Sequence, residues 1–169
     1  MDRLNELALF YIGRYATTRA KLSSYLARKV RERGWHGEGG PGIERLVERF
    51  AESGLVDDAS FALAKSRSLS ERGYGRGRVR QALRAAGIEA ADGEAANELA
   101  AEQAVDAAIR FARRRRIGPF AAQRPDRAAR EKALAAMIRA GHGFELARAV
   151  VDMAPGTEID LNELRSETS

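Results

Sequence analysis

Residues 54–62 read Gly-Leu-Val-Asp-Asp-Ala-Ser-Phe-Ala, and residues 72–75 read Arg-Gly-Tyr-Gly. In the first stretch Gly54 ends one helix, and Asp57 or Asp58 caps the N-terminus of the next. In the second stretch two glycines interrupt the helical pattern, which then resumes. The two stretches therefore predict a pair of helices joined by a tight glycine turn.

Helical periodicity extends in both directions from this pair. Apolar residues recur at spacings of three and four, with Thr17, Thr18 and Asp126 as candidate caps and Gly34 and Gly87 as stops. The pattern predicts an all-α protein with little or no β-structure and with helices over residues 4–15, 18–34, 43–54, 57–72, 79–87, 95–115, 126–141 and 144–153.

The longest predicted helix covers residues 95–115 and is rich in alanine. It follows a turn expected at Asp92-Gly93, and Gly118-Pro119 is expected to end it. Beyond Pro155-Gly156 the chain is acidic, and we expect a loose tail with one turn of helix around residues 161–164.

The apolar skeleton repeats along the chain. A shift of 57 residues places Leu4 on Phe61, Ile12 on Leu69, Thr18 on Gly75, Leu22 on Val79 and Leu26 on Leu83, and a further shift of 68 places Leu69 on Met137, Gly73 on Gly141, Gly75 on Gly143 and Leu83 on Val151. We therefore expect an elongated array of three tandem three-helix repeats over residues 1–54, 55–118 and 119–154, with a long third helix in the second repeat and a less complete third repeat. An acidic, flexible tail follows at residues 155–169.

The composition is that of a folded protein rich in basic side chains, with 44% hydrophobic and 31% charged residues and a net charge of +5. There are no cysteines, which excludes disulfides and thiolate zinc sites. No apolar run approaches the roughly 20 residues that cross a bilayer. We expect a cytoplasmic protein without membrane association, whose partner is polyanionic or acidic.

Several motifs together resemble the RecX family. Its central motif is similar to residues 54–62 and 72–75, followed by Val79, Leu83 and Gly87-Ile88. The family's first-repeat pattern resembles residues 14–22, and its third-repeat pattern resembles residues 139–144, so that the resemblance covers most of the chain. The departures are Lys21, where the family often has Glu, a long glycine-rich loop over residues 35–42, and an added link over residues 117–125.

The resemblance implies a regulatory protein that is not an enzyme and needs no cofactor. It implies binding in the groove of the RecA–DNA filament and inhibition of the recombinase, ATPase and coprotease activities of RecA, in DNA repair, homologous recombination and the SOS response. We further expect weak binding to single- or double-stranded DNA and a monomer. Two alternatives stay open from the residues alone: a helix-turn-helix-like DNA-binding protein that does not act through RecA, and an adaptor that binds only protein.

Two basic blocks supply the candidate partner-binding residues. The set predicted to contact RecA or DNA is Lys65, Arg72, Tyr74, Arg76, Arg78, Arg80, Arg84, Arg110, Arg113, Arg114, Arg115 and Arg116. Arg76, Arg78 and Arg80 stand at a helix start, where positive charge opposes the helix dipole, so we expect them to meet acidic or phosphate groups. Arg113 to Arg116 stand at a helix end, where positive charge is favourable without any partner, so contact with an anion and simple solvation remain equal interpretations.

Other motifs have simpler structural interpretations. The glycines of residues 73–77 favour an interhelix turn over a phosphate loop, because no apolar strand precedes them and no Gly-Lys-Ser/Thr sequence follows. The pair Asp57-Asp58 favours capping over metal binding, and the acidic row from Glu94 to Asp106 favours a solvated helix face. Trp35 is expected to pack on a helix end, while His36 and His142 belong to no recognisable catalytic set.

Overall fold

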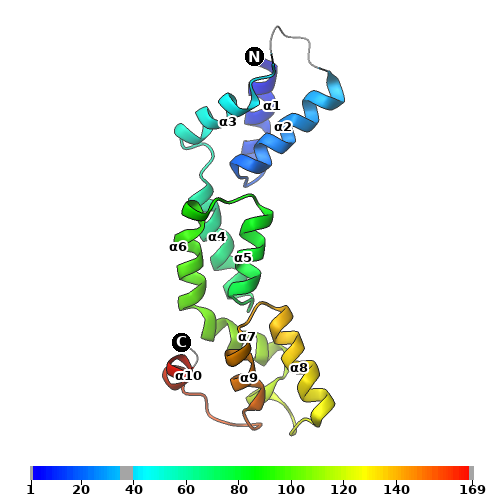
Figure 1. Ribbon diagram of the computed structural model, residues 1–169, viewed down its shortest axis with the longest axis vertical. Coiled ribbons are helices and arrows are strands. Elements are labelled where there is room, and N and C mark those ends of the chain that lie inside the picture. The colour runs from blue at the N-terminus through cyan, green and yellow to red at the C-terminus, as the bar shows by residue number, and fades with distance from the viewer. Residues whose placement is uncertain (1, 35–39, 168–169) are drawn as a thin grey trace. The chain divides into compact units, whose positions relative to one another are not determined.

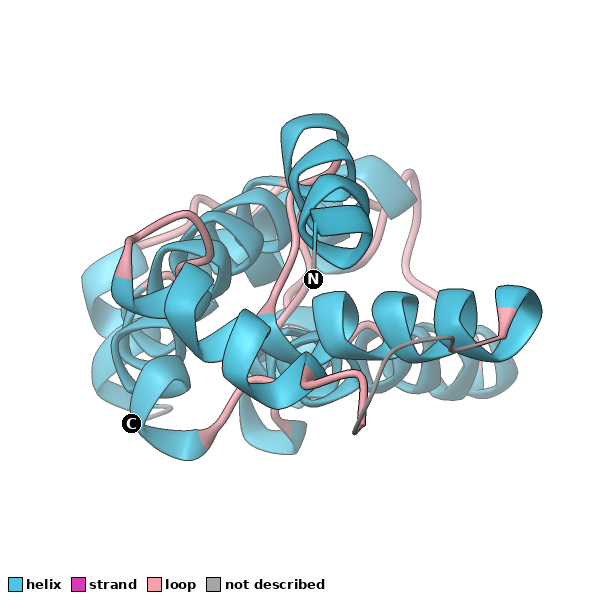
Figure 2. Ribbon diagram, turned by 90° about the horizontal axis from the view of Figure 1, so that it is seen from above, coloured by secondary structure: helices cyan, strands magenta, loops and turns pink. Residues whose placement is uncertain are grey.

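The computed structural model describes residues 2–34 and 40–167, and every regular element within them is helical (Figures 1 and 2). The all-α prediction is therefore confirmed. The elements are α1 (Asp2–Arg14), α2 (Arg19–Arg33), α3 (Ile43–Glu52), α4 (Asp58–Glu71), α5 (Arg76–Ala85), α6 (Ala90–Glu102), α7 (Ala104–Arg115), the 3-10 turn η1 (Gly118–Phe120), α8 (Arg127–Arg139), α9 (Phe144–Asp152) and α10 (Leu161–Glu167). Trp35 and His36, with the rest of residues 35–39, lie outside the described residues.

The chain forms two compact units. Unit 1 comprises Met1–Ala62 and Leu83–Gly93, and unit 2 comprises Leu63–Ala82 and Glu94–Ser169. Helices α4, α5 and α6 therefore each supply residues to both units. The repeat boundaries at residues 54, 118 and 154 stay a prediction, because these units do not correspond to them.

In unit 1 the apolar faces of α1, α2 and α3 form one core around Leu4, Leu22, Leu26, Val47 and Phe50. These are the stripes that the periodicity predicted, and their burial supplies the main free energy of folding here.

Thr18 caps α2, as predicted, because its hydroxyl oxygen accepts a hydrogen bond from the Lys21 amide at 3.2 Å. The same hydroxyl donates to the carbonyl of Ala86 at 2.7 Å. A Cβ on Gly87 would collide with Ala20, so the start of α2 packs directly on the turn that follows α5. Lys21, the departure from the family pattern, lies with its ammonium 4.9 Å from the centre of the Phe61 ring.

In unit 2 the core forms where α7, α8, α9 and α10 meet, around Val105, Ile109, Met137, Val150 and Leu164. Asp126 caps α8 by accepting from the Ala129 amide at 2.8 Å, which confirms the prediction for that residue. Not every predicted apolar position is buried: Ile138 is 44% exposed and Phe144 is 54% exposed, because they stand on the faces of α8 and α9 turned away from this core.

The prediction of one long helix over residues 95–115 is wrong. The segment holds two helices, α6 and α7, with Gln103 at φ −90° and ψ 3° between them. The predicted turn at Asp92-Gly93 is also wrong, because both residues lie inside the first turn of α6 and the Gly93 amide bonds the carbonyl of Glu89. Gly93 is buried within this helix.

The end of α7 and the acidic tail also bear on the predictions. Helix α7 ends at Arg115, as predicted, but Arg116 ends it by adopting the left-handed conformation, φ 56°, while Gly118-Pro119 begins η1. Within the expected loose tail, residues 161–167 form α10 and Leu164 is only 2% exposed. Burial of this leucine against α7 and α9 gives the acidic segment a fixed place on unit 2.

Candidate basic interaction surface

The glycine turn between α4 and α5 packs against the turn between α8 and α9. The Gly75 amide donates to the carbonyl of Ala140 at 2.9 Å, and the Gly77 amide donates to the carbonyl of Gly141 at 2.9 Å. A Cβ on Gly75 would collide with the Gly141 carbonyl, and one on Gly141 would collide with the backbone of Arg78. The interpretation as an interhelix turn is confirmed, and these two amides are not free to cradle a phosphate.

His142 also stabilises the contact between the two turns. Its Nε2 donates to the carbonyl of Gly73 at 3.0 Å, and its ring lies 5.5 Å from that of Phe111, centre to centre. The side chain is buried, and this burial lowers its pKa to about 4. His142 is therefore a neutral donor at physiological pH and serves the packing of the two turns.

A cavity of about 490 Å³ opens beside this contact, and we call it the arginine pocket. It is formed by the ends of α4, α7 and α8 and the start of α5, and it is lined by Arg72, Tyr74, Arg78, Phe111, Arg114, Arg115, Ala136, Arg139 and Ala140. Five of these residues belong to the predicted set, so the structure brings members of both basic blocks to one place. Sequence reasoning missed Arg139, although its position at a helix end just before a glycine turn matches that of Arg72.

Contacts within unit 2 hold several of the guanidinium groups in place. Those of Arg72 and Arg78 lie 5.3 Å and 5.8 Å from the centre of the Tyr74 ring. Arg114 donates to the carbonyl of Arg72 at 2.7 Å, and the Arg115 guanidinium lies 5.7 Å from the centre of the Phe111 ring. Such ring and carbonyl contacts orient a guanidinium without neutralising its charge.

No carboxylate of the described residues neutralises this cluster. The pocket has no acidic residue in its lining, and none of its five arginines forms an ion pair within the part of the chain that the structure describes. Elsewhere arginines do pair: the Nη2 of Arg165 lies 2.9 Å from Asp106, and Arg130 lies 2.6 Å from Asp152. The arginine pocket is therefore a concentration of positive charge oriented toward solvent and suited to an acidic or phosphate-bearing partner.

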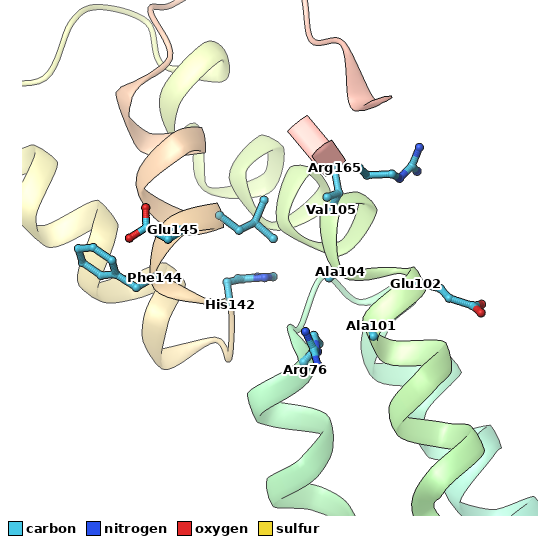
Figure 3. Close-up of a pocket in the computed structure, with 11 residues that line it drawn as sticks. Arg76, Ala101, Glu102, Ala104, Val105, His142, Phe144, Glu145 and Arg165 are labelled. Carbon is cyan, nitrogen blue, oxygen red and sulfur yellow. The ribbon is translucent and has the colours of Figure 1, made fainter. Parts of the chain in front are cut away.

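Arg76 belongs to a different cavity, of about 560 Å³, which Figure 3 shows from close up. Its lining mixes Arg76 and Arg165 with Glu102 and Glu145, around His142 and an apolar wall. Residues two apart on a helix point to opposite sides, so Arg76 and Arg78 cannot share one pocket. The predicted trio of Arg76, Arg78 and Arg80 is thus divided between surfaces.

The rest of the predicted set is exposed but lies outside the arginine pocket. Arg110 donates to the carbonyl of Ser70 at 3.4 Å, and the Arg113 guanidinium lies 5.1 Å from the centre of the Phe120 ring. Arg116 lines a neighbouring cavity. The side chains of Lys65, Arg80 and Arg84 are exposed on α4 and α5.

The two aspartates of the central motif have separate roles. Asp57 caps α4, accepting from the Ser60 amide at 2.9 Å, and these bonds lower its pKa. Asp58 is buried and accepts from the backbone amide of Arg19 at 2.9 Å and from its Nε at 3.3 Å, while Arg19 also pairs with Asp92. Asp58 therefore joins two segments of unit 1. No cluster in the described part of the chain groups three or more potential metal ligands.

The acidic row is discontinuous. Glu94, Glu98 and Glu102 are exposed on α6, in keeping with a solvated face, while Asp106 stands on α7 and pairs with Arg165. No helix in residues 2–34 and 40–167 combines the length and apolarity needed to span a bilayer.

These features define an all-helical protein whose helix pairs join at glycine turns and whose unit 2 carries an arginine-lined pocket. Comparison with known proteins identifies the family. Residues 57–96 match the family model described as "RecX, second three-helix domain". The chain is 35% identical over 163 residues to the regulatory protein RecX of Myxococcus xanthus (strain DK1622), covering 90% of this chain and 86% of that protein. The chain belongs to the RecX family of regulatory proteins.

Other relatives agree with this assignment. The regulatory protein RecX of Halorhodospira halophila (strain DSM 244 / SL1) is 34% identical over 119 residues, covering 69% of this chain and 68% of that protein. The crystal structure of RecX from Lactobacillus salivarius matches the fold with a TM-score of 0.63 at 18% identity, covering 89% of this chain and 93% of that one. A second crystal structure, of "regulatory protein RecX", gives a TM-score of 0.60 at 23% identity, covering 85% and 67%.

Proposed function

We propose that this chain binds the filament that the RecA recombinase forms on DNA and mainly inhibits its recombinase, ATPase and coprotease activities. Membership of the RecX family, supported by a relative that aligns over 90% of the chain, carries this proposal. The protein acts in the cytoplasm as a monomer, and its own affinity for DNA is weak.

The arginine pocket is the part of the surface that we assign to this binding. Five guanidinium groups converge there without a carboxylate in the lining that the described residues form. Burying such a cluster against an acidic or phosphate-bearing surface turns mutual repulsion into attraction across the interface. Arg72 and Arg114 are central because the Arg114 guanidinium bonds the Arg72 carbonyl and so links the two basic blocks.

A helix-turn-helix mode of duplex reading has less support. In that mode the N-terminal residues of the second helix enter the major groove. Here the first turn of α5 packs against residues 140–142, since the Gly75 and Gly77 amides bond the carbonyls of that turn. Arg76 and Arg78 of α5 line two different cavities, so they do not form one surface that could contact bases in a groove.

Charge reversal tests the proposal. The double variant Arg72→Glu with Arg114→Glu should weaken binding to RecA–single-strand filaments about tenfold or more, because each change replaces attraction with repulsion. The inhibition of the RecA ATPase should shift to higher protein concentration by the same factor. Binding is measured by fluorescence anisotropy of filaments formed on a labelled oligonucleotide.

Arg45→Glu is the control for a charge reversal outside the pocket. Arg45 is exposed on α3 in unit 1, and the variant carries one such charge reversal outside the pocket. It should bind filaments nearly as the unchanged protein does. If the unchanged protein neither binds filaments nor alters their ATPase, the proposed function is wrong; if both variants lose binding equally, the assignment to the arginine pocket is wrong.

A further inference from the structure

A second, smaller cavity adjoins the arginine pocket. It has a volume of about 280 Å³, lies between the end of α7 and the face of α8, and shares Arg115 and Ala136 with the arginine pocket. We call it the apolar pocket, because side chains such as Ile117, Ala133 and Val151 line it. The two cavities are therefore adjacent on unit 2, with Arg115 and Ala136 lining both, and we call the pair the depression.

The rim of the apolar pocket is cationic. Arg115, Arg116 and Lys132 contribute to its lining, and no carboxylate of the described chain does. None of the three forms an ion pair with a carboxylate among the residues that the structure describes. The depression thus combines an apolar floor at one end with guanidinium groups along its length.

We propose that this depression receives one segment of the protein partner, in which acidic residues flank an apolar side chain. The carboxylates meet Arg72, Arg78 and Arg139, and the apolar side chain fills the pocket between α7 and α8. The inference rests on the proposed function, and it names which chemistry of the filament is recognised: the protein rather than its DNA.

The lining of the apolar pocket favours a peptide side chain over a base. Bases bind proteins by stacking on aromatic rings or guanidinium planes. Of the described residues, no aromatic one lines the apolar pocket, and the Arg115 guanidinium already lies against the Phe111 ring. An aliphatic side chain suits a floor of Ile, Val and Ala, where burial of apolar area supplies affinity.

Two peptides that differ at one residue test this proposal on the intact 169-residue chain. One is a short synthetic peptide of Asp and Glu with a single central Leu, and the other has Ser in place of Leu. Because burying one Leu side chain is favourable, the Leu peptide should bind about tenfold more tightly. A single-stranded oligonucleotide of equal net charge should bind no more tightly than the Ser peptide. Affinities are measured by fluorescence anisotropy at low salt.

Variants of the chain test whether the peptides bind in these two cavities. Arg115→Glu should abolish binding of both peptides, since Arg115 lines both cavities. Arg115→Gln keeps a long polar side chain but removes the positive charge, so it should weaken binding less. Arg45→Glu should leave both affinities nearly unchanged.

Three outcomes would overturn the proposal: equal affinities for the two peptides, an oligonucleotide that binds as tightly as the Leu peptide, or unchanged peptide binding by Arg115→Glu. If filaments still bind while the Leu preference is absent, this inference fails alone. If the unchanged protein does not bind filaments, the proposed function fails as well.

Discussion

Gly75 stands where two backbone segments touch, and no other residue type fits there. A Cβ would collide with the carbonyl of Gly141, which is backbone and cannot move aside as a flexible side chain would. We expect Gly75→Ala to lower the free energy of unfolding by about 1–3 kcal/mol, as overpacking does elsewhere. Urea unfolding followed by circular dichroism measures the change.

Gly13→Ala is the control for this substitution. Gly13 lies inside α1, and a Cβ at this position would have no described neighbour within 4 Å, so alanine should stabilise the helix by roughly 0.5–1 kcal/mol. Equal effects of the two substitutions would contradict the close contact between the turns.

His142 makes stability depend on pH. Burial lowers its pKa to about 4, below the ordinary value of 6.5, so the unfolded chain takes up a proton at a pH where the folded chain does not. Stability is therefore complete above pH 6.5 and falls as the pH drops toward 4. Between about pH 7 and pH 4.5 the loss from this residue should be about 2 kcal/mol.

His142→Gln isolates that contribution, because glutamine does not titrate and its amide can still donate to the Gly73 carbonyl. The carboxylates titrate in both proteins, so the difference between their pH profiles of unfolding reports His142 alone. Parallel profiles would show that the histidine is not buried in its neutral form.

At the scale of elements, the polar caps and the glycine stops at Gly34 and Gly54 were reliable signals, whereas Asp92-Gly93 was not. The predicted ends of α2 and α3 and the caps Thr18 and Asp126 agree with the structure, because each depends on local backbone geometry. The break between α6 and α7 had no such signal. Gln103 is neither Gly nor Pro, so only packing distinguishes two helices from one, with Ala96 and Ala100 buried before it and Val105 and Ala108 after it.

Helix α10 is attached to the core of unit 2 through Leu164. Leu164→Ala should lower the free energy of unfolding by about 2–4 kcal/mol, because Leu164 is buried against α7 and α9. Ser166→Ala, on an exposed position of the same helix, should change it little. Thermal unfolding monitored by circular dichroism makes the comparison. A negligible effect of Leu164→Ala would favour the loose tail that the composition predicted.

At the scale of the whole molecule, composition and periodicity predicted the helical class and the positive surface, but not which arginines meet. The blocks containing Arg72 and Arg114 are separated in sequence by two helices, and only the folded unit 2 brings them together. Arg76 and Arg78 are sequence neighbours that the helix separates. Arg139 joined the pocket through the contact of two turns, which the repeat alignment related to each other without showing that they touch.

That contact also bears on how the protein is made. His142 and Gly73 are 69 residues apart, so the amides of Gly75 and Gly77 find their carbonyl partners only after the α8–α9 turn has left the ribosome. Until then the turn between α4 and α5 lacks these hydrogen-bond partners. The turn between α4 and α5 can therefore reach its final packing only after the last third of the chain has been translated. A product truncated before the α8–α9 turn lacks the carbonyls that bond Gly75 and Gly77, and it lacks part of the arginine pocket.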